Sequence, residues 1–485
     1  MIRIEFVDHS FMRVTGDEEC TREIWERFQF YVEGHRFSPK FKAGYWDGKI
    51  KLYNRLTGLV YAGLLEHVLA MATHNKWDVE IHEEDWKRND KLTLDAAETY
   101  FASIGLPFEP RPYQKAAFVS AMQNTREVLV MPTGSGKSLV IYLLARGLPG
   151  RSLIVVDNLG LIEQMASDIG DYGYKDHVHL IFAGQEKVHG EKITVSTWQS
   201  IMQKHPDWFN KFGTVIIDEC HKATAAELKR LMEKCTGVKY RYGFTGSMDE
   251  NNKVGELVLT GLFGPINRVT TSAELIQQEY LSEIQIRCIL LKYGQDECKE
   301  FWSQIGEFKD EVDYLAAHAK RNKMVCKIAS EHAKGNTMLI YRYHAHGDEL
   351  VKILRETTTR PVHQIDGRVK GKERERIRKI LAEETDAIIV GSIQTVSTGI
   401  NIPTLENVIF ASSTKAHNKV IQSIGRVLRR TQSKTNSKLF DIADDLTLVR
   451  KKSKKKNFTL KHFILRLQMY GEEQFPFTVS EIRMP

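Results

Sequence analysis

The residues with the most specific chemistry form a glycine-rich loop, MPTGSGKS, from Met131 to Ser138. The loop stands between a strand-like apolar run and an apolar helical pattern, as the phosphate-binding GxxxxGK[ST] motif requires, although Met131 occupies the place of the first glycine. Backbone N–H groups of such a loop and of the helix N-terminus receive phosphate oxygens. We expect Lys137 to reach the outer phosphates and the Ser138 hydroxyl to ligate Mg²⁺. The candidate phosphate-binding residues are Pro132, Thr133, Gly134, Ser135, Gly136, Lys137 and Ser138.

A pair of acids supplies the second half of a nucleotide site. Asp218 and Glu219 end the apolar run TVIIDECH, 81 residues after Lys137. Asp218 can hold Mg²⁺ through water, and Glu219 can polarise the water that attacks a γ-phosphate. Two acids at the end of a strand are by themselves compatible with a solvated turn. Their combination with the glycine-rich loop predicts ATP hydrolysis.

Parallel sheets are the elements that must position these residues. From about residue 108 to 270, apolar strand-like runs alternate with helical patterns, and a second series of the same kind runs from about 300 to 445. Such alternation predicts βαβ units. Residues 1 to about 85 have an α+β pattern, and after residue 446 the basic run RKKSKKK precedes a short helix. The predicted fold class is therefore α/β.

The overall composition limits the class of protein. The 485 residues are 42% hydrophobic and 27% charged, with a formal net charge of +7. This length predicts about three domains. No apolar run approaches the roughly 18–20 residues that span a bilayer, and the beginning has no signal-peptide pattern, so we expect a cytoplasmic protein. The six cysteines show neither a CxxC pair nor a zinc spacing, which indicates isolated reduced thiols.

Further motifs, in order along about 320 residues, resemble those of the superfamily 2 DExH helicases. The sequence DECH is similar to the DExH box, and the position of each other motif agrees with that family. These motifs are RPYQ (111–114) for the adenine-sensing Q motif, STWQS (196–200) for motif Ib, TGS (245–247) for motif III, GSIQTVSTGIN (391–401) for motif V and QSIGRVLRR (422–430) for motif VI.

The resemblance implies a fold and further site residues. Two tandem RecA-like domains would close on ATP, and the arginines of motif VI would reach the γ-phosphate from the second domain. His221 would couple the nucleotide site to Gln422 or to motif III. The residues added to the site are Arg111, Tyr113 and Gln114 for adenine, Gly399 for the nucleotide, and Gln422, Arg426 and Arg429 as catalytic residues beside Lys137, Asp218 and Glu219.

The resemblance also implies domain boundaries, with a small α+β domain before the motor and a short helical extension after it. The predicted domains are 1–88 (N-terminal, nucleic-acid-binding), 89–272 (first RecA-like, ATP-binding), 273–445 (bridge and second RecA-like) and 446–485 (basic helical extension).

A stretch that mixes cations with aromatic residues, RFSPKFKAGYWDGKIKLYNR from Arg36 to Arg55, is similar to the N-terminal domain of the recombination helicases of T-even phages. This closer resemblance covers essentially the whole chain, which would place the protein in the host cytoplasm. A hairpin with an aromatic core is the other interpretation of the stretch. The candidate nucleic-acid-binding residues are Arg36, Lys40, Lys42 and Lys49 here, Asn158, Thr197, Gln199 and Thr395 in the motor, and Lys452 and Lys455 in the basic run.

Motif Ia departs from the family pattern. The family has Pro-Thr after this strand, where the hydroxyl touches a nucleic-acid phosphate, whereas this chain has Asp157 and Asn158. An aspartate beside a phosphate track should repel it. We expect Asn158 and the following helix N-terminus to make the contact instead.

The resemblance implies an ATP- and Mg²⁺-dependent DNA helicase that moves 3′→5′ and acts as a monomer on branched DNA, recombination intermediates and R-loops, in which RNA–DNA hybrids occur. Three alternatives remain open. An RNA helicase of the same superfamily would use the same backbone contacts. The motor subunit of a restriction system would need a nuclease domain, for which 485 residues give no convincing pattern. A non-catalytic clamp would not need the intact catalytic residues.

Overall fold

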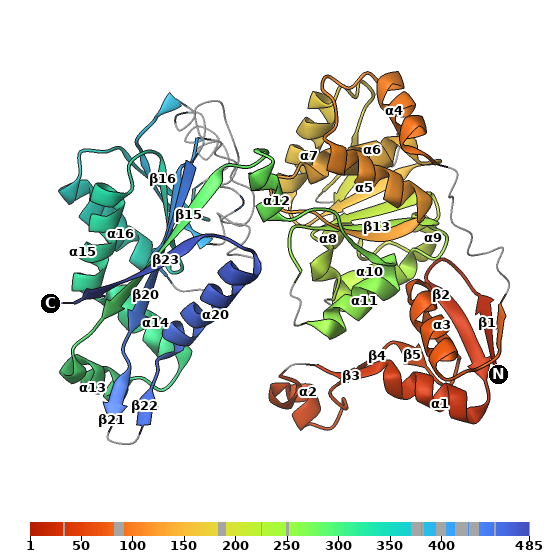
Figure 1. Cartoon of the computed structure of the whole chain (residues 1–485), viewed down its shortest axis with the longest axis horizontal. Helices are drawn as coiled ribbons and strands as arrows, with labels where there is room; N and C mark the ends of the chain where they lie inside the picture. The colour runs from red at the N-terminus through yellow and green to blue at the C-terminus, as the bar shows by residue number, and fades with distance from the viewer. Residues whose placement is uncertain are drawn as a thin grey trace. The chain divides into compact units, whose positions relative to one another are not determined.

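The computed structural model places the described residues in two units (Figure 1). One unit consists of residues 1–131 and 136–269, and the other of residues 132–135 and 270–485. No helix among the described residues is long and apolar enough to cross a bilayer. The described residues are 1–32, 34–81, 92–182, 191–224, 226–248, 252–369, 380, 383–393, 404–412, 425, 436–450 and 453–484.

The first unit begins with a five-stranded sheet in the order β5-β6-β2-β1-β7. Strands β1 and β2 are antiparallel, and their alternation buries Ile2, Ile4, Met12 and Val14 on one face. Helices α1 and α3 pack on the same core, for example through Ile24. The elements are β1 (Ile2–Phe6), β2 (Phe11–Gly16), α1 (Glu18–Arg27), β5 (Tyr53–Asn54), β6 (Leu59–Tyr61), η2 (Ala62–Leu64), α3 (Leu65–His74) and β7 (Val79–Ile81).

Residues 29–51, here called the N-terminal arm, project from this sheet (Figure 1). The arm contains β3 (Gln29–Tyr31), η1 (His35–Phe37), α2 (Pro39–Lys42) and β4 (Lys49–Lys51), and β3 pairs with β4 as a separate antiparallel hairpin. Gly48 adopts a left-handed φ of 79°, and a Cβ there would lie 2.7 Å from the His35 ring. Only glycine fits this close approach without strain.

A parallel seven-stranded sheet in the order β10-β11-β9-β12-β13-β8-β14 forms the rest of the first unit. Helices α5, α6 and α7 cover one face, and α10 and α11 pack on the other (Figure 1). The elements are α4 (Leu94–Ser103), α5 (Pro112–Gln123), β8 (Arg126–Val130), α6 (Lys137–Gly147), β9 (Ser152–Val156), α7 (Leu159–Asp171), β10 (His179–Ile181), β11 (Ile193–Thr197), α8 (Trp198–Ile201), α9 (Pro206–Phe209), β12 (Thr214–Asp218), η4 (Cys220–Thr224), α10 (Ala226–Lys234), β13 (Tyr240–Thr245), α11 (Lys253–Phe263) and β14 (Ile266–Arg268).

The N-terminal sheet and the parallel sheet share one hydrophobic core. The core runs without a break from Ile4 and Leu64 to Val128 and Leu259. At Gly63, an added Cβ would lie 2.0 Å from the Thr260 carbonyl oxygen, so η2 and α11 approach at backbone distance. The N-terminal segment is therefore packed as part of the first unit.

A buried arginine reinforces this junction. Arg241, at the start of β13, is 1% exposed and donates through Nη2 to the Ser10 hydroxyl at 2.6 Å and to the Cys235 carbonyl at 2.6 Å. The Tyr61 hydroxyl donates to Glu233 at 2.5 Å. Hydrogen bonds to charged groups contribute about 1.5–3 kcal/mol each, and leaving such a buried group unpaired costs more.

The second unit has its own parallel seven-stranded sheet, in the order β17-β18-β16-β19-β20-β15-β23. The two parallel sheets confirm the predicted α/β class with tandem RecA-like domains, while the predicted boundaries stay predictions. The elements are α12 (Ser272–Gln277), β15 (Glu283–Lys292), α13 (Gln295–Gln304), α14 (Phe308–Ala317), α15 (Ala319–Lys327), η5 (Ile328–His332), β16 (Thr337–Tyr341), α16 (His344–Thr357), β17 (Val362–Ile365), β18 (Ile388–Ser392), β19 (Asn407–Phe410) and β20 (Asn436–Asp445).

The C-terminal residues are built into this second unit. Strand β23 (Phe477–Arg483) pairs in parallel with β15 and forms an edge of the sheet. Helix α20 (Phe458–Glu472) begins on buried Glu311, which accepts from the backbone N–H groups of Phe458 at 2.7 Å and Thr459 at 2.8 Å. The described residues of the basic run lie in or next to β21 (Leu448–Arg450) and β22 (Ser453–Lys455), which pair as antiparallel strands.

Candidate ATPase site and nucleic-acid interface

The glycine-rich loop follows β8 and leads into α6, as the sequence predicts. Gly134 and Gly136 have left-handed φ angles of 86° and 79°, which a side chain would strain. A Cβ on Gly136 would also lie 2.4 Å from Nε2 of Gln114. Lys137 donates to the Met131 carbonyl at 3.2 Å, and the Ser138 hydroxyl shares a 2.6 Å hydrogen bond with the Tyr172 hydroxyl.

The two acids end β12 beside this loop. Glu219 has a φ of 54°, a left-handed conformation that costs a non-glycine residue about 1–3 kcal/mol and that clusters at functional sites. Its backbone N–H donates to Asp218 Oδ1 at 3.0 Å. Nδ1 of His221 lies 3.3 Å from Glu219 Oε2 and 3.0 Å from the Thr245 hydroxyl. His221 thus connects Glu219 to motif III, as predicted from the family.

The environment shifts the pKa values of the two carboxyl groups in opposite directions. Burial raises the pKa of Asp218, and the neighbouring Glu219 charge raises it further. Burial opposes ionisation of Glu219 as well, but its hydrogen bond with His221 and the positive charge of Lys137 outweigh burial and hold its pKa below the ordinary value. Glu219 therefore stays ionised and can accept a hydrogen bond from water, whereas Asp218 carries a buried charge that a cation would stabilise.

The donor set fits Mg²⁺. The Ser138 hydroxyl and the Asp218 carboxylate are hard oxygen ligands of the kind that Mg²⁺ prefers when it is also bound to phosphates. Burial and the neighbouring Glu219 charge raise the pKa of Asp218, and a bound cation would favour its ionised form. Ser138 and Asp218 would hold the ion, and Lys137 the outer phosphates.

The Q-motif residues lie next to the glycine-rich loop. Gln114 is 4% exposed, accepts from the Arg111 backbone N–H at 2.8 Å and directs Nε2 toward the Gly136 carbonyl at 3.5 Å. Arg111 also donates to the Tyr113 hydroxyl at 3.0 Å. The three candidate adenine residues therefore form one group that touches the phosphate loop.

The unusual aspartate of motif Ia is neutralised within the fold. Asp157 forms a 2.6 Å ion pair with Lys222, which follows the DECH sequence. The expected repulsion of a phosphate is reduced by this pair. Asn158 caps α7 by accepting from the Leu161 N–H at 3.2 Å, so the helix N-terminus is formed as predicted, and its contact with nucleic acid stays a prediction.

The motif Ib residues have structural partners of their own. Thr197 is 3% exposed, and its hydroxyl caps α8 by accepting from the Ser200 N–H at 3.4 Å. Gln199 donates to the Asp157 carbonyl at 3.4 Å. Gln199 is exposed, whereas Thr197 is buried. Their role as nucleic-acid contacts stays a prediction.

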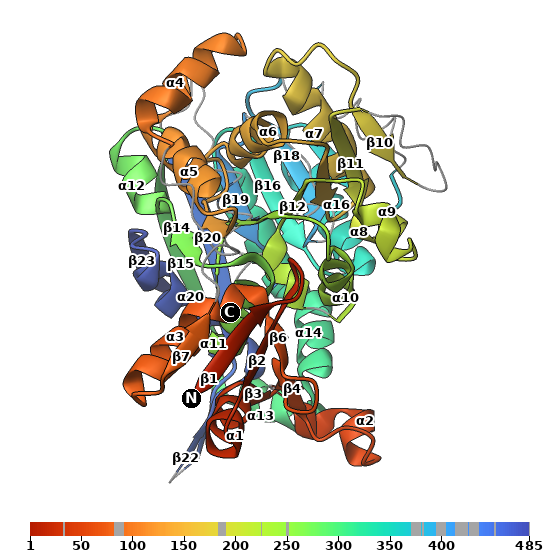
Figure 2. The same ribbon diagram turned by 90° about the vertical axis from the view of Figure 1, so that its right-hand side faces the viewer.

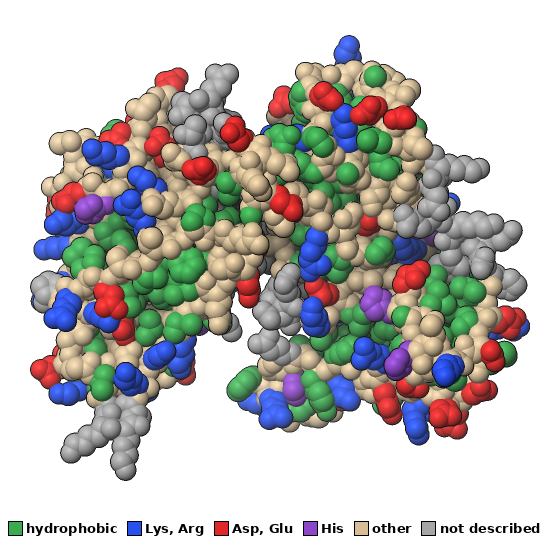
Figure 3. Space-filling view, in the orientation of Figure 1, with side chains coloured by type: hydrophobic (Ala, Val, Ile, Leu, Met, Phe, Trp, Pro, Cys, Tyr) green, Lys and Arg blue, Asp and Glu red, His purple; other side chains and the backbone are tan. Residues whose placement is uncertain are grey.

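The N-terminal arm presents cations and aromatic rings together (Figure 3). Arg36, Lys40 and Lys42 are exposed, and Lys49 lies over the Tyr31 ring with its Nζ 4.9 Å from the centroid. The most exposed rings of the arm are Tyr31 at 59%, Phe37 at 81% and Tyr45 at 88%. The hairpin is present, and Trp46 is half-buried and donates to the Lys49 carbonyl at 2.9 Å, whereas these three rings lie at the surface. The nucleic-acid contacts of the arm stay a prediction.

Lys455 of the basic run already has an aromatic partner. Its Nζ lies 3.6 Å above the centre of the Trp302 ring. A cation–π contact of this kind is worth about 0.5–1 kcal/mol at an exposed site. A nucleic-acid phosphate would have to compete with it.

Several predicted site residues lie outside the described residues, and their roles stay predictions. They are Thr395, Gly399, Gln422, Arg426, Arg429 and Lys452.

Two residues with clear roles at the site were missed by sequence reasoning. Tyr172 reaches Ser138 from the end of α7, and Lys222 reaches Asp157 from η4. Neither residue belongs to a motif, so the sequence around each of them does not indicate its role. The six cysteines are free thiols, as predicted, and all six are buried.

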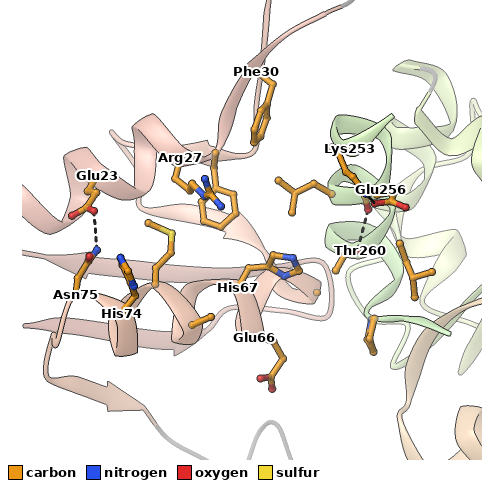
Figure 4. Close-up of a pocket in the computed structure, with 17 residues that line it drawn as sticks. Glu23, Arg27, Phe30, Glu66, His67, His74, Asn75, Lys253, Glu256 and Thr260 are labelled. Carbon is orange, nitrogen blue, oxygen red and sulfur yellow. Dashed lines mark hydrogen bonds and ion pairs between the residues drawn. The ribbon is translucent and has the colours of Figure 1, made fainter. Parts of the chain in front are cut away.

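A pocket of about 1050 Å³ lies at the junction of the N-terminal segment and the motor, between α1, α3 and α11 (Figure 4). Arg27 and His67 point into it, and Lys253 and Glu256 border it on α11. Burial and the Arg27 charge lower the pKa of His67. None of the lining residues belongs to the candidate ATPase site.

Three protein families match successive parts of the chain. Residues 1–82 match "DNA helicase UvsW, N-terminal", residues 107–250 match "Type III restriction enzyme, res subunit", and residues 320–431 match "Helicase conserved C-terminal domain".

Whole-length similarity connects these parts. The chain is 31% identical to the ATP-dependent DNA helicase uvsW of Enterobacteria phage T4, with all of both chains covered. The crystal structure of T4 UvsW aligns with this chain over the full length of both, with a TM-score of 0.52 and 28% identity. The DNA 3′-5′ translocase XPB2 of Sulfurisphaera tokodaii is 26% identical over 58% of this chain and 59% of its own.

Proposed function

Because the chain belongs to the UvsW-like family of superfamily 2 DNA helicases, we propose that it moves 3′→5′ along one strand and unwinds branched DNA and R-loops. ATP-dependent DNA helicase activity follows from this membership. The related XPB2 is a DNA 3′-5′ translocase, which supports this polarity. The observation that carries the catalytic proposal is the cluster of Asp218, Glu219 and His221 beside Lys137.

The chain's own residues divide the work of ATP hydrolysis. Lys137 and the loop N–H groups bind the phosphates, and Gln114 with Arg111 and Tyr113 orients the adenine. Bound Mg²⁺ would neutralise phosphate charge as hydrolysis proceeds. Glu219 orients and polarises the attacking water, and His221 holds Glu219 in place. Arg426 and Arg429 are proposed to add positive charge at the γ-phosphate when the nucleotide is bound.

The N-terminal arm is proposed to grip the duplex next to the branch. Its lysines and Arg36 suit duplex phosphates, and an exposed ring such as Phe37 or Tyr45 can stack on the terminal base pair at a fork. Nucleotide-site residues have no means of recognising a branch, so this recognition requires a separate surface.

The proposal is tested by measuring ATP hydrolysis and unwinding on single strands, 3′- and 5′-tailed duplexes, forks, four-way junctions and R-loops, with DNA and RNA as the tracking strand. We expect activity with a DNA tracking strand, 3′→5′ polarity, and faster unwinding of branched substrates than of tailed duplexes. Equal rates on all duplex substrates would contradict the branch preference. Faster movement on RNA would favour an RNA helicase, and cleavage of plasmid DNA with Mg²⁺ would favour a restriction motor.

A further inference from the structure

Two histidines and a glutamate converge at the edge of the first parallel sheet, away from the ATPase site. The candidate ligand atoms of His177, His179 and Glu191 all lie within 4.8 Å of one another. His179 begins β10, and Glu191 lies two residues before β11, the parallel neighbour of β10. Figure 2 shows β10 at the margin of the sheet beside β11.

The local backbone explains the convergence. His177 and His179 are two residues apart in the chain that leads into β10, a spacing that directs side chains to the same side of an extended strand. Parallel pairing brings the segment before β11 alongside, because His179 is the register partner of Thr194. Glu191 comes three residues before Thr194, so its carboxylate can reach the two imidazoles.

The three candidate ligands differ in burial. His177 is exposed, Glu191 is half-buried and His179 is 7% exposed. Thr194, on the same face as His179, is fully buried, and its hydroxyl has no hydrogen-bond partner among the residues that the structure describes. The neighbouring cation, Lys192, directs its ammonium to the carbonyl oxygens of Leu148 and Gly150.

We propose that His177, His179 and Glu191 bind a divalent transition-metal ion of the zinc type. Two imidazoles and one carboxylate form a three-ligand set that zinc accepts, with water completing the tetrahedron. Imidazole ligands favour zinc and its transition-metal neighbours over Mg²⁺ or Ca²⁺, so this site is chemically distinct from the Mg²⁺ position at Asp218.

The position in the sheet assigns the ion a structural role. The three ligands lie at the amino ends of β10 and β11, whereas the glycine-rich loop and Asp218 follow the carboxyl ends of β8 and β12. All strands of this sheet are parallel, so the two sites lie at opposite ends of the strands. The ion would link β10, a three-residue strand at the edge of the sheet, to the segment before β11 and so stabilise it.

The test uses the full-length protein, freed of metal by a chelator, and titrates it with Zn²⁺ or Co²⁺ alone. We expect one equivalent of Zn²⁺ to bind, four-coordinate Co²⁺ to give visible absorption bands that Zn²⁺ removes, and the melting temperature to rise. His177→Gln changes an exposed residue and Glu191→Gln a half-buried one, and each removes one ligand while keeping a polar side chain. Each variant should weaken Zn²⁺ binding at least about tenfold and abolish the thermal shift.

The matched control is His205→Gln, because His205 is an exposed histidine 3.2 Å from the carboxylate of Asp207, and no third ligand completes a site there among the described residues. Its affinity for Zn²⁺ should equal that of the wild type. The proposal is overturned if the wild type binds no stoichiometric Zn²⁺, if either ligand variant binds as tightly as the wild type, or if the control loses binding equally.

Discussion

At the scale of single residues, the ATPase site assigns different tasks to two adjacent carboxylates. Glu219 has a left-handed backbone conformation and a side chain 3.3 Å from His221, whereas Asp218 is buried against a like charge. Strain and charge repulsion of this kind are typical of catalytic sites, where the free energy is recovered on binding substrate.

Glu219→Gln should bind ATP with nearly normal affinity and hydrolyse it about 10³-fold more slowly, because the amide cannot polarise the attacking water. Lys137→Ala should lose both binding and hydrolysis, because the positive charge on the outer phosphates is removed. Phosphate release and binding of a fluorescent ATP analogue measure the two effects. Glu227→Gln removes an exposed acid from α10 and should change neither; hydrolysis by Glu219→Gln at the wild-type rate would refute its assignment.

Asp218→Asn should stabilise the nucleotide-free protein while abolishing hydrolysis. The raised pKa of Asp218 means that its ionised form opposes folding at pH values above that pKa. Asparagine removes the charge and keeps an oxygen for the Glu219 N–H, so the free energy of unfolding at about pH 8 should rise by about 1–2 kcal/mol. The gain should shrink as the pH falls through the raised pKa. Urea unfolding in a chelator, at about pH 8 and about pH 5.5, tests this; a variant less stable at the higher pH would contradict it.

At the scale of elements, the N-terminal arm is a short hairpin with a helical tip that buries little of its own aromatic surface. Three of its rings are more than half exposed. A folded protein rarely leaves several aromatic residues and cations together at the surface without a binding role. The nearby turn between β5 and β6 offers a comparison, because Leu56 is 97% exposed there but is an aliphatic side chain that cannot stack as an aromatic ring does.

Phe37→Ala combined with Tyr45→Ala should weaken binding to forked DNA about tenfold or more, since each stacked base contributes about 1–3 kcal/mol. Affinity for single strands and the melting temperature should hardly change, because both rings are exposed. Fluorescence anisotropy with fork and single-strand probes measures the difference. Leu56→Ala is the matched control and should bind forks normally; unchanged fork binding by the double variant would place branch recognition elsewhere.

At the scale of the whole molecule, the N-terminal segment is physically continuous with the motor. The shared core and the bond from Arg241 to Ser10 join residues 231 positions apart. A change of activity after removal of this segment would therefore mix two effects, loss of DNA contacts and loss of stability.

A chain that begins at residue 89 should lose several kcal/mol of unfolding free energy, because each large apolar side chain that loses its partners costs about 1.5–3 kcal/mol. Urea unfolding and dye binding to exposed apolar surface measure this. A control variant in which a short glycine–serine turn replaces residues 34–47 keeps β3, β4 and the shared core. Its free energy of unfolding should stay within about 1 kcal/mol of that of the wild type. Equal stability of the truncated chain would contradict the continuous core.

Arg429→Ala should leave ATP affinity within a few-fold of the wild type and slow hydrolysis about 10³-fold, because an arginine finger stabilises the transition state more than bound nucleotide. Arg430→Ala makes the same change of charge one residue later and is the control. Single-turnover hydrolysis and nucleotide binding separate the two quantities. Equal losses of affinity and rate would argue against the finger.

The sequence by itself determined the α/β class, the glycine-rich loop and the acids of the ATPase site. These features depend on patterns that are local in the sequence. Alternating strand and helix patterns produce parallel sheets, and in a parallel sheet the carboxyl ends of β8 and β12 lie on the same side. The chemistry of phosphate binding restricts residue types at fixed spacing, so the loop can be identified without knowing its neighbours.

Only the tertiary structure decided which distant residues meet. Lys222 neutralises Asp157 across 65 positions, Tyr172 holds Ser138, and β23 completes the second sheet beside β15. The sequence also did not show that Phe37 is exposed and Trp46 half-buried, because the two rings occur in the same aromatic stretch. Such pairings depend on strand order and packing between distant segments, and these are properties of the folded chain that no local pattern of residues encodes.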